Sequence, residues 1–111
     1  MKLRTEVQRE FNINKGDTHH PIEFRLVNMH NLLPIDISQA KAIFILLKER
    51  EEVLRSDVNL EHGVAGIGRH DWKEGETDKQ GIYSGYFELT CKDGNYFRIP
   101  EGDEFIKIEI E

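Results

Sequence analysis

The sequence predicts an all-β fold, an antiparallel β-sandwich built from short strands. Turn-forming residues recur about every 8–12 residues, and short apolar stretches with a period of two lie between them. The turn signals are Lys15-Gly16-Asp17, Asn28 to Pro34, Gly75, Asp93-Gly94 and Pro100 to Asp103. No repeat, linker or shift in composition divides the chain, so residues 1–111 are expected to form a single domain.

The first strand regions lie before residue 30. Residues 1–12 are expected to form an edge strand or an arm used in assembly. After the turn at Gly16, apolar and other residues alternate, which predicts a strand with one buried face. The inward set is Ile22, Phe24 and Leu26, and the outward set is Glu23, Arg25 and Val27.

Residues 38–58 are compatible with two secondary structures. Their composition is typical of a helix, and Lys48 and Glu52 have the spacing of a helical ion pair. However, the charged run that starts at Lys48 interrupts any apolar stripe after six apolar residues, 42–47. A run of this length is typical of a strand buried on both faces, and we therefore predict a strand.

The C-terminal third contains the clearest alternation. Strand 82–91 has an inward set of Tyr83, Phe87, Leu89 and Cys91, with Gly85 between them. Asp93-Gly94 predicts a type I′ hairpin turn, whose two central residues need positive φ, so residues 95–99 should return antiparallel. The last strand, 104–110, has an inward set of Ile106, Ile108 and Ile110.

The composition argues against several classes of partner. The formal charge of −6 and the pI near 5.4 disfavour nucleic acid and anionic membranes, because both are bound through basic surfaces. No apolar run approaches the ~18 residues that span a bilayer, and residues 1–6 lack the apolar stretch of a signal peptide. The single cysteine, Cys91, excludes an internal disulfide and indicates a reducing compartment.

The usual patterns of catalysis are missing. The glycines at 63, 66 and 68 are not followed by the long helix that a phosphate-binding turn needs. Ser84 lacks the glycine two positions earlier that a nucleophile elbow requires. His70 and Asp71 are neighbours on a predicted strand, so their side chains should point to opposite faces.

Metal-binding patterns are missing as well. The other histidines are His19, His20, His30 and His62, and none has the spacing that places two imidazoles on one side of an element. Cys91 ends an inward set, which indicates a buried and inert thiol. We therefore predict no catalytic residue, no cofactor and no metal ion.

Aromatic residues suggest one binding function. Trp72, Tyr83, Tyr86, Tyr96 and Phe97 would be a stacking platform for sugar rings if they gathered on one surface. Aromatic residues on alternating strands more often fill a sandwich core, and a sugar pocket also needs convergent polar groups. A small carbohydrate- or host-surface-binding module is therefore the alternative function.

The order and spacing of several motifs resemble a family of tailed-phage proteins. In the second half they are Gly66-Ile-Gly-Arg69-His-Asp71-Trp72, residues 73–83, Tyr86-Phe87-Glu88-Leu89-Thr90, Asp93-Gly94 and Ile99-Pro100. In the first half they are Lys15-Gly16-Asp17-Thr18 and Leu33 to Ser38. The family is the immunoglobulin-like domain at the N-terminus of phage baseplate upper proteins, which also occurs as short free-standing tail proteins. The similarity covers about residues 13–110.

The resemblance implies an immunoglobulin-like sandwich with a non-enzymatic, structural role in a phage or prophage tail or baseplate. Such a protein would be made in the host cytoplasm and would assemble in several copies with other virion subunits. The resemblance also implies that residues 40–48 are a core strand, with Ala42, Phe44 and Leu46 facing inward.

Three positions of that strand depart from the family pattern. Ile43, Ile45 and Leu47 are large and apolar where the family commonly has outward polar residues. Either another part of the chain, such as residues 1–12, covers them, or they form a subunit interface. Burying each side chain contributes about 1.5–3 kcal/mol, so exposure would be costly. The family usually has a short glycine turn where this chain has the charged residues 49–52. It usually has an aromatic residue such as tyrosine at the position of His70.

Overall fold

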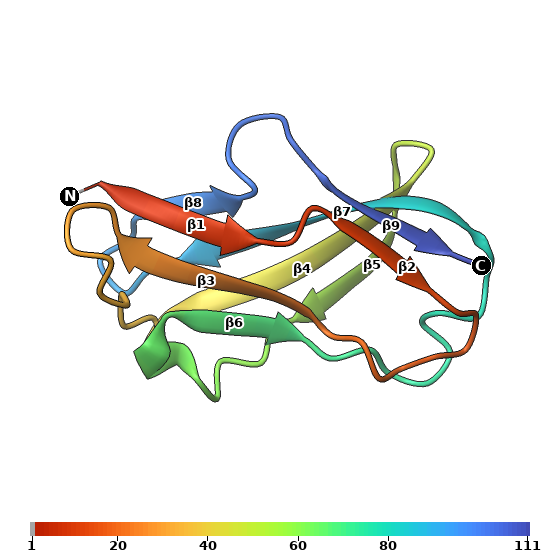
Figure 1. The fold of residues 1–111 in the computed structure, drawn as a ribbon, viewed down its shortest axis with the longest axis horizontal. Helices are drawn as coiled ribbons and strands as arrows, with labels where there is room; N and C mark the ends of the chain where they lie inside the picture. Colours follow the sequence, from red (N-terminus) through yellow and green to blue (C-terminus); the bar gives the residue numbers. More distant parts are fainter. Residues whose placement is uncertain (1) are drawn as a thin grey trace.

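The protein is a sandwich of two β-sheets, described by a computed structural model for residues 2–111 (Figure 1). The strands are β1 (Leu3–Val7), β2 (Glu10–Ile13), β3 (Ile22–Asn28), β4 (Lys41–Lys48), β5 (Glu51–Asp57), β6 (Ile67–His70), β7 (Gly81–Thr90), β8 (Tyr96–Ile99) and β9 (Ile106–Ile110). The small sheet has the order β1-β3-β6 and the large sheet the order β2-β9-β7-β4-β5, with β8 also paired to β7. The predicted all-β sandwich is confirmed.

The core lies between the sheets and is formed by the predicted alternating side chains. Phe24 and Phe44 both pack against Phe87, with ring centroids 4.7 and 5.1 Å away. The inward residues predicted for β3, β7 and β9 are buried, except that Cys91 lies beyond β7 and is only partly buried. Gly68 of β6 is needed for this packing, because a Cβ at this position would lie 2.4 Å from the ring of Phe24.

The N-terminal residues are divided between the two sheets. β1 pairs antiparallel with β3 at the edge of the small sheet, whereas β2 pairs parallel with β9 at the edge of the large sheet. β9 and β7 separate β2 from β4. The explanation that residues 2–12 cover Ile43, Ile45 and Leu47 is therefore wrong.

Residues 41–57 form a hairpin, and the predicted strand is confirmed. β4 and β5 pair antiparallel with a bulge between Leu46 and Leu47. The two turn residues both have positive φ, 52° at Glu49 and 69° at Arg50. The helix suggested by composition does not form, because the apolar run is buried from both sides of β4 instead.

The hairpin after β7 is confirmed, but its turn is not type I′. Gly94 has a φ of 91°, and Asp93 is not among the residues with positive φ. The N–H of Gly94 donates to the carbonyl of Cys91, and the N–H of Cys91 donates to the carbonyl of Asn95. This is a three-residue loop that ends in a left-handed glycine, the second common form of a tight hairpin.

Val27 is buried, although the alternation placed it on the outward face. The chain folds back after β3, so that Val27 forms a bridge with Pro34 and the N–H of Asn28 donates to the carbonyl of Leu33. A loop that covers the end of its own strand cannot be detected from the period of two.

Helical structure is limited in residues 2–111 to one 3-10 turn, Gly63–Ala65. Within this range no helix has the length and apolar character needed to cross a membrane.

Candidate interaction surfaces

The outer face of the large sheet, turned away from the core, contains the predicted interface residues. Ile45 lies directly opposite Arg55 of β5 and Tyr86 of β7. Residues paired in this way place their side chains on the same face, and Ile45 is 0% exposed. Ile43 and Leu47, two positions away on either side, are partly exposed. The structure thus brings the three side chains together, and Ile45 is covered by its cross-strand neighbours.

An aromatic–arginine cluster extends this outer face beyond β7. The guanidinium carbon of Arg98 lies 4.4 Å from the ring centroid of Tyr86 and 4.8 Å from that of Phe105. The two rings meet edge to face at 5.8 Å. Nη1 of Arg98 also donates to the carbonyls of Pro100, Gly102 and Glu104. Arg98 therefore fixes both the loop between β8 and β9 and the position of the exposed Phe105.

Charged groups of both signs surround Glu88 on the same face. The hydroxyl of Tyr96 donates to a Glu88 oxygen at 2.6 Å, and this hydrogen bond raises the pKa of Tyr96. Nη1 of Arg55 lies 3.9 Å from Glu88, and its Nη2 lies 2.8 Å from Glu52, whose hydrogen bond raises the pKa of Arg55. The face combines aromatic rings and arginine, which are enriched at protein interfaces, with charged groups typical of an interface rim.

The five aromatic residues considered for sugar stacking do not form one platform. Trp72 and Tyr83 are buried in the core, where the indole N–H donates to the carbonyl of His20 and the phenol to that of Lys79. Tyr86 and Tyr96 lie on the outer face, and Phe97 packs against the core. Phe105 was included in the predicted strand 104–110 but was not selected as a surface residue. In the structure β9 begins at Ile106, so Phe105 lies in the preceding loop and is exposed.

His70 is part of the core rather than of a catalytic pair. Its ring is 1% exposed, and its Nε2 lies 3.1 Å from Oε1 of Glu76. Burial lowers the pKa of His70, so the neutral imidazole donates to the carboxylate. Asp71 is exposed and accepts from the amide of Asn59, on the opposite side of the backbone. The predicted separation of His70 and Asp71 is confirmed.

The carboxylate of Asp17 lies close to two imidazoles at a turn. Asp17 lies within 3.4 Å of the imidazole of His19 and 2.9 Å of that of His20, and the N–H of His19 lowers the pKa of Asp17. In the part of the chain that the structure describes, no three His, Cys, Asp or Glu side chains are placed to hold a metal ion.

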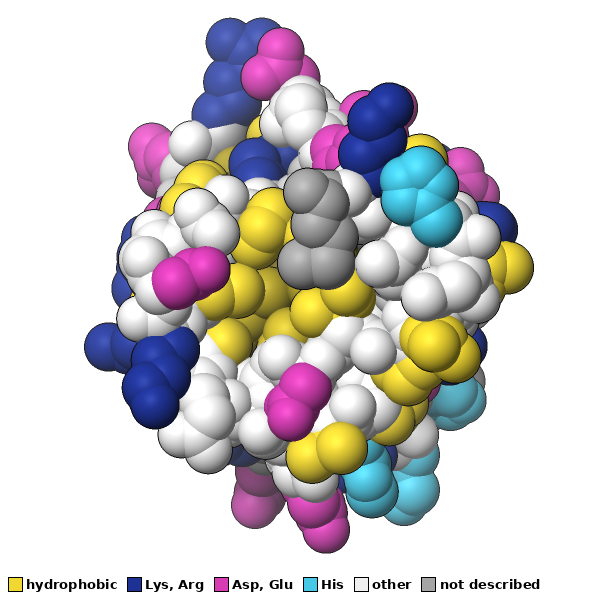
Figure 2. Space-filling model, turned by 90° about the vertical axis from the view of Figure 1, so that its left-hand side faces the viewer, with side chains coloured by type: hydrophobic (Ala, Val, Ile, Leu, Met, Phe, Trp, Pro, Cys, Tyr) yellow, Lys and Arg dark blue, Asp and Glu magenta, His cyan; other side chains and the backbone are white. Residues whose placement is uncertain are grey.

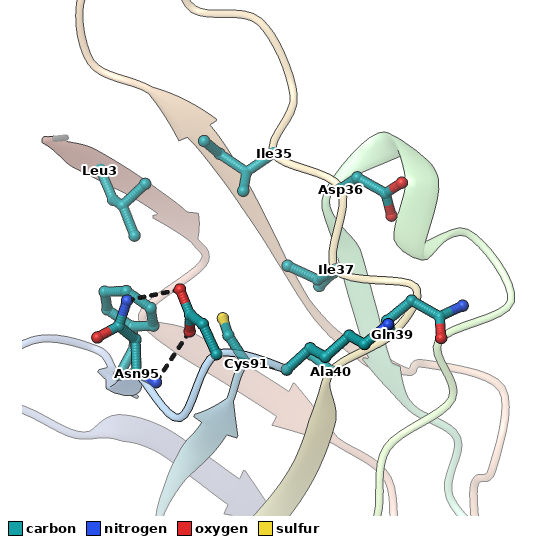
Figure 3. Close-up of a pocket in the computed structure, with 11 residues that line it drawn as sticks. Leu3, Ile35, Asp36, Ile37, Gln39, Ala40, Cys91 and Asn95 are labelled. Atoms are coloured by element: carbon teal, nitrogen blue, oxygen red, sulfur yellow. Dashed lines mark hydrogen bonds between the residues drawn. The ribbon is translucent and has the colours of Figure 1, made fainter.

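An apolar hollow opens at one end of the sandwich. Figure 2 views this end and shows hydrophobic side chains at the bottom of the hollow, which has a volume of about 280 Å³. Its apolar residues are Leu3, Ile35, Ile37, Ala40, Cys91 and Phe97. In Figure 3, Leu3, Ile35 and Ile37 point toward the space, whereas Asp36 points away. We call this feature the end hollow.

Neither Asp36 nor Cys91 provides a reactive group in the end hollow. Asp36 accepts from the N–H of Ser38, as expected for a short polar residue before a strand, and its hydrogen bonds with Ser38 lower the pKa of Asp36. The Cys91 thiol is free, and burial raises its pKa, which disfavours the reactive thiolate.

No protein-family model matches the sequence, and no curated protein matches it significantly. The resemblance to the phage baseplate family is therefore based on the order and spacing of the motifs in this chain.

Proposed function

We propose that the protein is a non-enzymatic structural component of a phage or prophage tail or baseplate, and that it acts in the virion by assembling with other subunits. The order of the motifs between residues 13 and 110 supports the family. The strand order supports the immunoglobulin-like fold, since β1, β3 and β6 take the positions of strands A, B and E. β9, β7, β4 and β5 take the positions of strands G, F, C and C′.

A side-chain hydrogen bond gives independent support for this fold. Immunoglobulin-type sandwiches contain a tyrosine near the start of strand F whose hydroxyl bonds to backbone a few residues upstream. Tyr83 is the third residue of β7, and its hydroxyl donates to the carbonyl of Lys79 at 2.8 Å.

The observation that carries the assembly function is the ordered aromatic cluster on the outer face. Phe105 is 42% exposed, yet it is held against Arg98 and Tyr86. Aromatic residues and arginine are enriched at the centres of interfaces, and a side chain that is already ordered loses little entropy on binding. We therefore expect other subunits to dock on Phe105 and its neighbours.

The test is the protein content of particles released from the host. Mass spectrometry of density-purified virions should detect the chain, and gold-labelled antibody should mark the tail or baseplate in electron micrographs. Phe105→Ala in the resident gene should lower the amount of chain per particle, whereas Val64→Ala, at an exposed residue of the 3-10 turn, should not. Particles of normal infectivity that lack the chain would refute the function.

The exposed rings favour a second candidate, a carbohydrate- or host-surface-binding module. Tyr96 and Phe105 lie on one face with Glu88 and Arg55, which supplies both apolar rings and hydrogen-bonding groups for a sugar. Binding on an array of cell-wall glycans that is lost in Phe105→Ala would support this candidate. Trp72→Ala is not a suitable variant, because Trp72 is a core residue.

A further inference from the structure

One side of β7 is completed by two strands, and only one of these is paired further. β9 pairs with Gly81–Gly85 and β8 with Phe87–Thr90. β2 continues the sheet beyond β9, but β1, which precedes it in sequence, crosses to the small sheet and pairs with β3. Among the described residues, β8 pairs with no strand other than β7.

The outer edge of β8 presents backbone N–H and C=O groups that are not paired with another strand of the described residues. Cys91 and Asn95 are a hydrogen-bonded pair, because the N–H of Cys91 donates to the carbonyl of Asn95 at 2.8 Å. Hydrogen-bonded and non-bonded pairs alternate along an antiparallel ladder. The N–H and C=O of Tyr96 and Arg98 therefore point away from β7.

β1 presents a second unpaired edge toward the same space. The N–H of Met29 donates to the carbonyl of Lys2 at 3.0 Å, so the same alternation turns the backbone groups of Leu3 and Thr5 away from β3. Leu26, the partner of Thr5, supports this register, because its own N–H donates to the carbonyl of Gly66 on the other side.

A hollow lies between these two edges, next to the end hollow. It has a volume of about 330 Å³ and is lined by Leu3, Thr5, Tyr96, Phe97, Arg98, Glu101 and Gly102. Leu3 and Phe97 also line the end hollow, so the two spaces are adjacent. We call the combined space the β1–β8 groove; Figure 1 shows β1 and β8 on the same side of the molecule.

We propose that the β1–β8 groove binds an extended segment of a partner protein, which adds to β8 as a further strand. This inference rests on the proposed assembly function and names the mode of docking. A purely apolar ligand would leave the edge groups of Tyr96 and Arg98 without partners, whereas an extended backbone pairs with them. Because β1 borders the groove on its other side, a single strand is a better fit than the edge of a second domain.

The groove also determines which side chains of the bound partner segment should be apolar. Residues of an added strand that lie opposite Tyr96 and Arg98 share their outer face, so the alternate residues point into the groove beside Leu3 and Phe97. These alternate residues should be apolar.

The net charge of the chain favours a basic segment. The acidic residues that line the groove are Asp93 and Glu101 and the basic ones are Lys92 and Arg98, while Asp36 points away from the space. Arg98 already donates to three backbone carbonyls. With a chain charge of −6, lysine or arginine at the ends of the segment is the complementary choice.

The test uses the peptide acetyl-Lys-Val-Thr-Val-Thr-Val-Lys-amide and NMR of the ¹⁵N-labelled protein. Binding should shift the amide signals of Leu3 and Phe97 and should slow hydrogen exchange of the Tyr96 and Arg98 amides at least tenfold. In an antiparallel added strand the N–H groups of the two threonines face β8. The control peptide is N-methylated at both threonines, which removes these N–H groups, and it should bind at least tenfold more weakly. Equal binding of the two peptides, or no shift at millimolar peptide, would overturn the proposal.

Variants of the protein locate the site. Tyr96→Pro removes one outward N–H but no ladder hydrogen bond with β7, and it should weaken binding at least tenfold. Leu3→Glu, which places a charge in the groove, should do the same if the proline variant fails to fold. Ile82→Ser, at an exposed position of β7, should leave binding unchanged. Loss of binding in Ile82→Ser but not in Leu3→Glu would place the peptide elsewhere and refute the groove.

The result of the peptide-binding experiment is independent of the result of the virion experiment. A chain that is present in particles but binds no peptide keeps its structural function and loses the strand-addition mode. A chain that binds the peptide through β8 but is absent from particles keeps the groove and loses the phage assignment.

Discussion

The imidazole of His70 stacks on the phenyl ring of Phe44, with centroids 4.5 Å apart and ring planes inclined by 19°. The edge of Trp72 meets the imidazole at 4.8 Å. His70 thus packs as tyrosine or another aromatic residue would. The difference is that histidine can take up a proton inside the core.

Stability is expected to fall on acidification because of His70. Burial holds its folded pKa below the unfolded value of about 6.5, so the unfolded chain takes up the proton first. The contribution of the neutral His70 to the free energy of unfolding is complete above pH 6.5 and is lost as pH falls through the folded pKa. Over this range the free energy of unfolding changes by at most about 1.4 kcal/mol per pH unit. Urea unfolding at several pH values should give this slope in the wild type and a smaller one in His70→Tyr. If the unfolding free energy of the two proteins changed equally with pH, His70 would not be the cause.

The turn between β4 and β5 is expected to be a site for stabilisation. Glu49 and Arg50 both have positive φ, a conformation that costs side-chain-bearing residues roughly 1–2 kcal/mol each. The double change Glu49→Asn and Arg50→Gly supplies the preferred residues of this turn. It should raise the free energy of unfolding by about 1 kcal/mol. Asp93→Asn, in the other hairpin, where φ is not positive, is the control and should have little effect.

Arg98→Lys is expected to be nearly as harmful as Arg98→Ala. Lysine lacks the planar group that contacts Tyr86 and Phe105 and donates to the carbonyls of the 100–104 loop. Both changes should lower the free energy of unfolding by about 2 kcal/mol. Amide exchange in residues 101–105 should become faster. A lysine variant with wild-type exchange would show that the guanidinium geometry is unimportant.

Tyr83→Phe is expected to lose the hydrogen bond to Lys79 and nothing else. The ring is buried, so the unfolding free energy should fall by about 1 kcal/mol. Tyr96→Phe removes an exposed hydroxyl that contacts Glu88 and should cost less than about 0.5 kcal/mol. Thermal unfolding of both variants gives the loss of unfolding free energy in each. Equal losses in Tyr83→Phe and Tyr96→Phe would contradict a structural role of the Tyr83 hydroxyl.

Ile45→Ala is expected to destabilise the isolated protein, although Ile45 lies on the outer face. Its side chain is 0% exposed beneath Arg55 and Tyr86, so truncation should cost about 2–4 kcal/mol. Ile82→Ala, at a 60% exposed position of β7, should stay within about 0.5 kcal/mol. A loss at Ile45 that occurs only in assembled particles would show that a partner, not the chain itself, covers it.

The strands could be predicted because alternation depends on burial of one sheet face. Phe24, Phe87 and Ile108 all lie inward as their period of two required. The conformations of the loops that follow the strands account for the exceptions. Val27 is covered by the loop that returns through Pro34, and Asp93 has no positive φ because a third residue enlarges its turn.

The candidate surfaces were predictable only in part. The outward direction of Ile43, Ile45 and Leu47 follows from the position of the strand in the sheet. Which of them stays accessible depends on Arg55 and Tyr86, which lie 10 and 41 positions after Ile45 in the sequence. Phe105 lies in the loop before β9 and is held against Arg98, a contact that the alternation in residues 104–110 does not reveal.

The sequence by itself determined the all-β class, the inward residues and the hairpin at Asp93-Gly94, because each depends on neighbours within a few positions. Only the tertiary structure decided that β1 and β2 join different sheets and leave the edge of β8 open. Strand pairing is a contact between distant segments, and the backbone groups that form it are the same in every residue. Side-chain patterns therefore indicate which face of a strand is buried, but not which edge finds a partner.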